Sequence, residues 1–123
     1  HVHTEFSPDS EVFLREYLEK GIKKIMLTDH VDIGSPDAMF EKIIDYEVYS
    51  KFVKNLGGEF DAEILIGVEI GYQKEYLDEI NTFVRSFSFD FVIGSIHYAD
   101  GLDFYNGDFF KGKTQNEAYR RYF

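Results

Sequence analysis

The sequence predicts an α/β fold in which parallel strands alternate with helices that cross over between them. Three observations predict this class of fold. Short apolar runs stand between polar turns, stretches of helical periodicity separate these runs, and a histidine or a carboxylate follows each run. The expected order is strand end, helix, strand, helix, strand, helix, strand, helix. This alternation is compatible both with a barrel and with an open doubly wound sheet.

The first strand is expected to end at His1-Val2-His3. Asp9 and Ser10 then precede a helical segment that Gly21 can end. The apolar run at 25–27 lies between lysines and Thr28-Asp29-His30, which is typical of a short buried strand. A turn at 34–37 separates this strand from the next helix.

The second half of the sequence repeats the alternation. A longer helix is predicted to run to about Leu56, with Gly57-Gly58 as its stop. The remaining predicted elements are a strand at 64–68, a helix at 75–87, a strand at 89–96 and a helix from 114 to 123. Neither a repeat nor a linker interrupts this order, which favours one domain or part of one.

Composition excludes several classes of protein. The 123 residues are 44% hydrophobic, enough for one domain core, yet no run of about 18 apolar residues predicts a membrane span. Cysteine is absent, which excludes disulfides, thiolate zinc sites and a cysteine nucleophile and fits a cytoplasmic location. The net charge of −10, from 23 acidic and 13 basic residues, disfavours a nucleic-acid partner.

The four histidines of the sequence fall at predicted strand ends. They are His1, His3, His30 and His97, and Glu69 follows a further strand directly. In a parallel α/β fold the carboxyl ends of all strands point to the same side, where functional groups collect. The joint placement therefore predicts one site built from four successive strands.

These side chains are suited to binding metal ions. In an extended strand His1 and His3 point to the same side, so both imidazoles can reach one cation. Neutral imidazole is a good ligand for zinc, iron or manganese. Glu69 could bridge two cations at a spacing of about 3.5–4 Å, as in two-metal hydrolysis.

Two aspartates have alternative interpretations. Asp9 could return to the same site, but capping of the first helix would explain it equally well. Asp29 could orient a neighbouring ligand, or could merely end its strand.

Other chemistries are poorly supported. The sequence has neither a Walker-type phosphate loop nor a G-x-G-x-x-G motif. Ser95 and His97 are near neighbours along one predicted strand, so they cannot form a nucleophile–base pair. A serine hydrolase is therefore disfavoured.

The residues that carry chemistry lie in five short motifs: His1-Val2-His3-Thr4, Ser7-Pro8-Asp9-Ser10, Thr28-Asp29-His30, Gly67-Val68-Glu69-Ile70 and Gly94-Ser95-Ile96-His97-Tyr98. Together they resemble the polymerase and histidinol phosphatase (PHP) superfamily, and within it the stand-alone histidinol-phosphate phosphatases. The run at 90–101 is the most specific piece. The resemblance covers essentially the whole chain in the right order.

The resemblance implies a distorted (β/α)7 TIM-like barrel with up to three divalent metals at its mouth. Residues 1–123 would then be a single partial barrel domain, cut at both ends, with about the first four β/α units. A further ligand histidine and a late Asp-x-His pair of the family are absent from this stretch. We therefore expect weak metal affinity and little turnover from the 123-residue chain alone.

By position, the resemblance assigns each metal ligand. His1, His3 and Glu69 would hold one metal, Glu69 and His97 a second, and Asp9 and His30 a third. Catalysis would depend on Glu69, His97 and Asp29, with a metal-bridging hydroxide attacking phosphorus. The metals would be zinc, manganese or iron.

The implied activity is that of a phosphomonoesterase acting on L-histidinol phosphate in histidine biosynthesis. One alternative is a PHP phosphoesterase for another small phosphate ester, such as a nucleotide. Another is a non-catalytic PHP module that binds metal for structure and partner contact. The ligand pattern disfavours this module, since degenerate modules tend to lose such residues.

Overall fold

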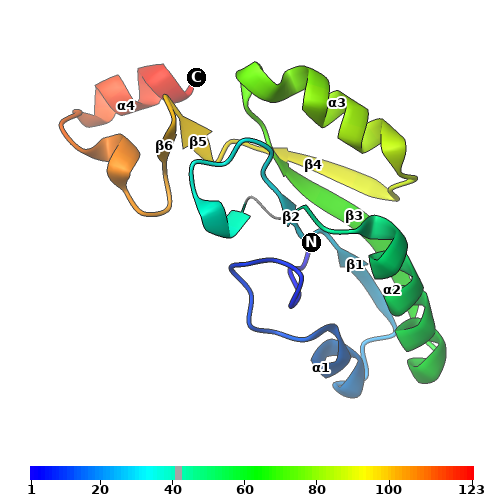
Figure 1. The fold of residues 1–123 in the computed structure, drawn as a ribbon. Coiled ribbons are helices and arrows are strands. Elements are labelled where there is room, and N and C mark those ends of the chain that lie inside the picture. The colour runs from blue at the N-terminus through cyan, green and yellow to red at the C-terminus, as the bar shows by residue number, and fades with distance from the viewer. Residues whose placement is uncertain (41–42) are drawn as a thin grey trace.

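The computed structural model describes residues 1–40 and 43–123 (Figure 1). The α-helices in this part of the chain are α1 (Leu14–Glu19), α2 (Tyr46–Phe60), α3 (Leu77–Ser86) and α4 (Gln115–Tyr122). The strands are β1 (Lys24–Leu27), β2 (His30–Val31), β3 (Glu63–Gly71), β4 (Phe91–Ser95), β5 (Tyr98–Ala99) and β6 (Leu102–Asp103). Short 3-10 turns lie at Ala38–Phe40, Lys74–Tyr76 and Asp108–Phe110.

The main sheet is parallel and has β3 at its centre. β1 and then β2 pair with one side of β3, and β4 pairs with the other side. Val2 pairs in parallel with Leu27, so the first residues extend the sheet beyond β1. Among the described strands the order in this sheet follows the order in the chain and never reverses. A doubly wound sheet has a reversal, so the structure favours the barrel alternative.

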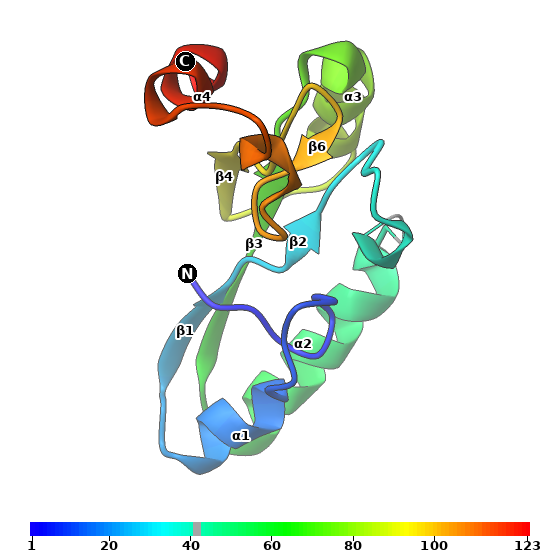
Figure 2. The ribbon, with the colours of Figure 1, turned by 90° about the vertical axis from the view of Figure 1, so that its left-hand side faces the viewer.

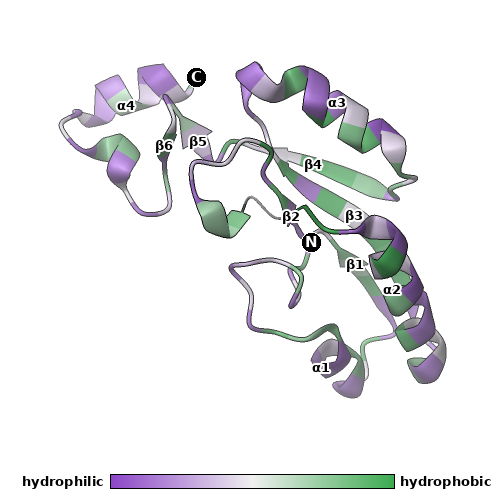
Figure 3. Cartoon of the chain, viewed as in Figure 1, coloured by the Kyte–Doolittle hydropathy of each residue, from purple (hydrophilic) through white to green (hydrophobic). Residues whose placement is uncertain are grey.

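Three helices cover the sheet through one continuous core. Residues of α1, α2 and α3 join β1, β2 and β3 in a single apolar cluster: Leu14, Leu18, Ile25, Leu27, Val31, Tyr46, Tyr49, Val53, Leu56, Val68, Ile70 and Ile80. The ring of Tyr46 contacts three phenylalanine rings around α3, those of Phe83, Phe87 and Phe89. Figure 3 shows the apolar colour concentrated on the strands and on parts of the helices, while α4 is mostly hydrophilic.

The first helix is shorter than predicted. α1 begins at Leu14, whose amide donates to the carboxylate of Glu5 at 2.7 Å. Glu16 accepts a hydrogen bond from the amide of Phe13 and so caps the same turn. The prediction that the helix starts after Asp9-Ser10 is therefore wrong, and Asp9 does not cap it.

The second helix runs through its predicted stop. α2 continues past Gly57-Gly58 to Phe60 and ends at Asp61, which takes the left-handed conformation with φ of 49°. A Cβ on Gly57 would lie 3.0 Å from the carbonyl oxygen of Ala62. Gly57 therefore does not end the helix. Its missing side chain leaves room for the segment that leads into β3 to pass close to α2.

The predicted strand at 89–96 is followed by a hairpin that the prediction lacks. β5 and β6 pair antiparallel across Asp100-Gly101, whose φ angles of 56° and 70° are both positive. Two positive φ angles define the tight hairpin turn that Asp-Gly favours. The hairpin and α4 project away from the main sheet (Figure 1), and in Figure 2 the hairpin lies at the upper end of the sheet with α4 above it. No helix within the described ranges has the length and apolarity needed to cross a membrane.

Candidate metal centre

The candidate site lies at the carboxyl ends of the parallel strands. His30 in β2 pairs in register with Glu69 in β3, and Glu69 pairs on its other side with Ile93 of β4. The side chains of Val68 and Ile70 enter the core, so alternation directs Glu69 to the opposite face of the sheet. His97 follows the end of β4.

The carboxylate of Glu69 stands between three imidazoles. Its Oε2 lies 3.2 Å from Nε2 of His1 and 3.3 Å from Nε2 of His3. Its Oε1 lies 3.1 Å from Nε2 of His97. A separate pair joins Nε2 of His30 to Oδ2 of Asp9 at 3.3 Å.

The six predicted ligands form three overlapping groups. These are His1-His3-Glu69, His3-Asp9-His30 and His30-Glu69-His97, and in each group the ligand atoms lie within 4.8 Å of one another. The first group has the same members as one predicted ligand set. The second group contains the predicted pair Asp9 and His30 and adds His3. The third group contains the predicted pair Glu69 and His97 and adds His30.

The donor geometry fits divalent cations. A tetrahedral ion with ligands at 2.0–2.2 Å sets its ligand atoms about 3.3–3.6 Å apart, close to the separations around Oε2 of Glu69. This buried oxygen accepts no hydrogen bond in the described structure, although two imidazole nitrogens are near it. The buried Nδ1 of His30 likewise has no hydrogen-bond partner there. Buried polar atoms without partners are costly, and a cation bound at Oε2 of Glu69 would remove that cost for this oxygen.

Ser7 determines the tautomer of His3. The Ser7 hydroxyl donates its one hydrogen to Oδ1 of Asp29 at 2.8 Å. It therefore has to accept the contact at 3.3 Å with Nδ1 of His3, which places the proton on that nitrogen. Nε2 of the neutral ring then presents a lone pair toward Glu69. Two lone pairs facing each other repel unless a cation or a proton lies between them.

Asp29 lies behind these ligands and belongs to none of the three groups. Its carboxylate is fully buried and accepts four hydrogen bonds, two from Thr4, one from Ser7 and one from Tyr49. This network holds the loop that carries His3 and Ser7 against β1. The catalytic role predicted for Asp29 stays a prediction, and its visible contacts are those of a group that orients the loop.

Opposing effects act on the pKa values in the centre. Burial opposes ionisation of Glu69, but the Ser95 side chain, His30 and His97 outweigh it and hold its pKa below the ordinary value. Burial likewise disfavours the charged form of His97. The carboxylates of Asp32 and Glu69 overcome this and raise the pKa of His97. The centre therefore favours an ionised carboxylate at neutral pH, as metal binding requires.

Two residues that contact the predicted ligands, Ser7 and Asp32, were not predicted as members of the site. Asp32 lies 2.9 Å from Nδ1 of His97 and is only 2% exposed. Its position two residues after His30 was a usable signal, because alternation in extended chain puts both residues on one side. Ser7 was quoted in a motif, but only the fold reveals its contacts with Asp29 and His3.

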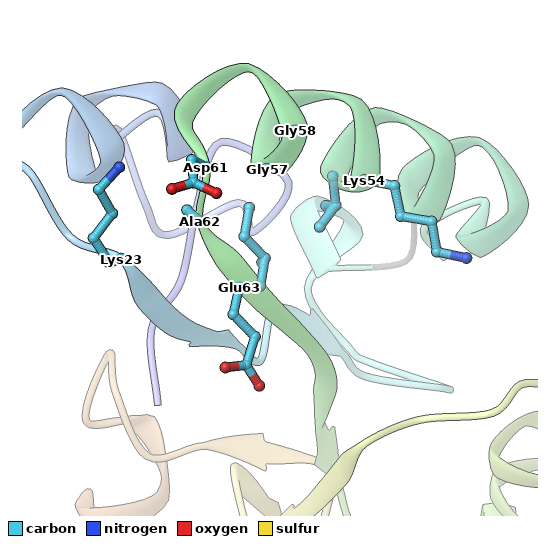
Figure 4. A pocket seen from close by; sticks show the side chains of 9 residues that line it. Lys23, Lys54, Gly57, Gly58, Asp61, Ala62 and Glu63 are labelled. Atoms are coloured by element: carbon cyan, nitrogen blue, oxygen red, sulfur yellow. The ribbon is translucent and has the colours of Figure 1, made fainter.

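Two surface pockets of about 580 Å³ lie outside the metal centre. One is at the start of β3, among Lys23, Lys54, Asp61 and Glu63 (Figure 4). It is at the opposite end of β3 from Glu69 and holds none of the predicted ligands. The other pocket lies among the residues that come after the carboxyl ends of β3 and β4. Its lining includes Tyr72, Lys74, Tyr98 and Arg121. Of these two pockets, the second is on the side where the ligands gather.

The chain matches a known protein family and curated relatives over its whole length. The model of the PHP domain family matches residues 1–123. A protein named "Probable histidinol-phosphatase" from Clostridium acetobutylicum is 33% identical, over 100% of this chain and 48% of its own length. The histidinol-phosphatase of Lactococcus lactis subsp. lactis is 34% identical, over 99% of this chain and 47% of its own length. The chain thus spans about half the length of the curated relatives it matches.

A solved structure also resembles this fold. The crystal structure of histidinol phosphate phosphatase from Lactococcus lactis, complexed with zinc, L-histidinol and phosphate, superposes with a TM-score of 0.85 at 35% identity. The match covers 99% of this chain and 48% of that one. It confirms the predicted α/β class and makes the parallel sheet part of a TIM-like barrel. With a family match over its whole length, the chain belongs to the PHP domain family.

Proposed function

We propose that this chain carries part of the active site of a metal-dependent phosphomonoesterase that hydrolyses L-histidinol phosphate to L-histidinol and phosphate. The observation that carries the proposal is the position of Glu69, with three imidazole nitrogens 3.1–3.3 Å from its two oxygens. The two relatives that are 33% and 34% identical to this chain over 129 residues are named probable histidinol-phosphatase and histidinol-phosphatase. The related crystal structure was obtained with zinc, L-histidinol and phosphate.

The metal ligands we propose are His1, His3, Asp9, His30, Glu69 and His97. Their nitrogen and carboxylate donors suit zinc, and they also suit manganese and iron, so we propose up to three divalent ions. Bound divalent ions supply Lewis acidity, which activates water and neutralises charge on phosphoryl oxygens. We also propose a cytoplasmic location and a place for residues 1–123 within one barrel domain.

The protein groups would act by holding this centre in one geometry. Glu69 stays ionised, because its contacts lower its pKa, and its two oxygens face different imidazoles. Asp29 and Ser7 fix the loop and the tautomer of His3. The reaction joins a water oxygen to phosphorus, breaks the ester P–O bond and returns a proton to the departing alkoxide.

The proposal is tested by phosphate release from L-histidinol phosphate. The assay uses the full-length protein that contains this chain, loaded with zinc or with manganese, and a nucleotide monophosphate is run in parallel. Glu69→Gln is expected to abolish release, because the amide cannot supply the anionic ligand. Glu63→Gln is the matched control: it alters an exposed glutamate at the other end of the same strand, where Glu63 pairs with Lys24.

Each outcome selects one function. Release from L-histidinol phosphate that is lost in Glu69→Gln and kept in Glu63→Gln supports the proposal. Preference for the nucleotide would retain the metal centre and replace the substrate. Absence of release from both esters, with metal bound, would instead favour a non-catalytic metal-binding module.

A further inference from the structure

Asp32 contacts the candidate metal centre without belonging to any of its three ligand groups. Its carboxylate is 2% exposed, and Oδ1 lies 2.9 Å from Nδ1 of His97. The other ring nitrogen of His97 faces Oε1 of Glu69 at 3.1 Å. The imidazole is therefore held between a buried carboxylate on one side and the candidate metal centre on the other.

The chemistry of this contact determines where the proton of His97 resides. The ring of His97 faces a carboxylate on each side, and Asp32 is both the closer one, at 2.9 Å against 3.1 Å for Glu69, and the more deeply buried one. We therefore assign the one proton of the neutral ring to Nδ1, which donates to Asp32. In the neutral ring Nε2 then bears a lone pair, and this lone pair faces the candidate metal centre. A carboxylate behind the ring is the arrangement that fixes both orientation and tautomer of histidine ligands in metal sites.

Gly71 provides the space for this contact. A Cβ built on Gly71 would overlap Oδ1 of Asp32 and would lie 3.1 Å from Nδ1 of His97. Gly71 is not among the residues with positive φ, so its backbone does not require glycine. The close approach of Asp32 and His97 is what excludes a side chain there.

We propose that Asp32 is a positioning residue that holds His97 in its Nδ1-protonated form with Nε2 free for a metal ion, and that Gly71 is required for this contact. The metal-binding part rests on the proposed function. The tautomer of His97 does not, because it can be measured in metal-free protein.

The first test is a ¹⁵N NMR spectrum of the histidine rings in the metal-free full-length protein, recorded at rising pH until the His97 signals no longer change. The His97 signals are assigned by their loss in His97→Gln. We expect a proton on Nδ1 in the unaltered protein, and a shift toward the Nε2-protonated form in Asp32→Asn, where the amide can also donate. A proton on Nε2 in the unaltered protein would overturn the proposal without any variant.

The second test is zinc affinity, measured by competition with a chelating dye. Asp32→Asn is expected to weaken binding about 10–100-fold, the usual cost of losing a partner behind a ligand. Asp78→Asn, an exposed aspartate in α3, is the matched control and should bind zinc normally. Unchanged affinity in Asp32→Asn would refute the role of Asp32, provided that the unaltered protein binds zinc.

A double-variant cycle tests the role of Gly71. Gly71→Ala should weaken zinc binding when Asp32 is present, because the added methyl group overlaps the Asp32 carboxylate. In a protein that already carries Asp32→Ala this carboxylate is absent, so Gly71→Ala should have little further effect. Equal losses in both backgrounds would show that Gly71 acts independently of Asp32. A full-length protein that neither binds zinc nor releases phosphate would refute the proposed function, and the NMR result would still decide the tautomer.

Discussion

Two tyrosines that lie three residues apart in α2 should respond in opposite ways to replacement by phenylalanine. We expect the stability of the fold to decrease at one position and to stay the same or increase at the other. Tyr49 and Tyr46 are both almost fully buried, at 1% and 2% exposure. The hydroxyl of Tyr49 donates to Oδ2 of Asp29 at 2.7 Å. The hydroxyl of Tyr46 has no hydrogen-bond partner among the described residues. Replacement by phenylalanine removes one oxygen in each case, but only at Tyr49 does it also remove a hydrogen bond.

The expected magnitudes follow from these contacts. Tyr49→Phe removes a hydrogen bond to a buried carboxylate, which costs about 1.5–3 kcal/mol in the free energy of unfolding. Oδ2 of Asp29 keeps the Thr4 hydroxyl at 2.9 Å, so the carboxylate is not left without donors. Tyr46→Phe removes an unpaired buried hydroxyl and should be neutral or stabilising, by up to about 1–3 kcal/mol.

The assay is urea unfolding of the full-length protein and its two variants, followed by circular dichroism. A lower midpoint for Tyr49→Phe with an unchanged m-value would report the predicted loss of stability. In a thermal melt the same loss corresponds to a fall in Tm of roughly 3–12 °C for a domain of 150–250 residues. Equal losses in both variants, or a larger loss in Tyr46→Phe, would refute the hydrogen-bond network around Asp29.

Three further predictions concern alkaline pH, the core and the metal. Burial and then the charge of Asp29 raise the pKa of Tyr46 and Tyr49 above its unfolded value of about 10, so both keep their protons in the folded state. The unfolded state therefore binds fewer protons above pH 10, and urea unfolding should show stability falling by about 1.4 kcal/mol per pH unit for each residue. A slope that Tyr49→Phe leaves unchanged would contradict this. Leu27→Ala should cost about 2–5 kcal/mol, because Leu27 is fully buried, whereas Leu102→Ala at a 39% exposed site should cost far less in the same assay. Chelation of metal should lower Tm, and zinc at a hundred times its Kd should restore about 2.7 kcal/mol; an unchanged Tm would argue against a metal bound to the folded state.

Much of the fold could be predicted because the strands that matter are short, apolar and buried. The alternation of strand and helix located β1, β3 and β4 and the cores of α2, α3 and α4. It could not locate β2, which has only two residues and forms through its pairing with β3. Nor could it show that α2 continues through Gly57-Gly58, because the close approach of the Ala62 carbonyl, which accounts for the glycine at 57, is a contact of the folded chain.

Prediction of the candidate site depended on residue type and strand position together. All six predicted ligands come together, because the carboxyl ends of parallel strands meet on one side. The partners behind them were harder to find. Ser7 and Asp32 contact His3 and His97 through tertiary structure, and the sequence shows their spacing but not those contacts. Asp9 was ambiguous from sequence, and the later start of α1 leaves it free to reach His30.

The most direct test of the central claim is an anomalous diffraction map of zinc-loaded crystals of the full-length protein, measured at the zinc edge. We expect a zinc peak within about 2.0–2.2 Å of Oε2 of Glu69 and of Nε2 of both His1 and His3. We also expect a peak between Glu69 and His97, whose facing atoms Oε1 and Nε2 lie 3.1 Å apart. Zinc bound elsewhere, with no peak within ligand distance of Glu69, would contradict the assignment of this centre.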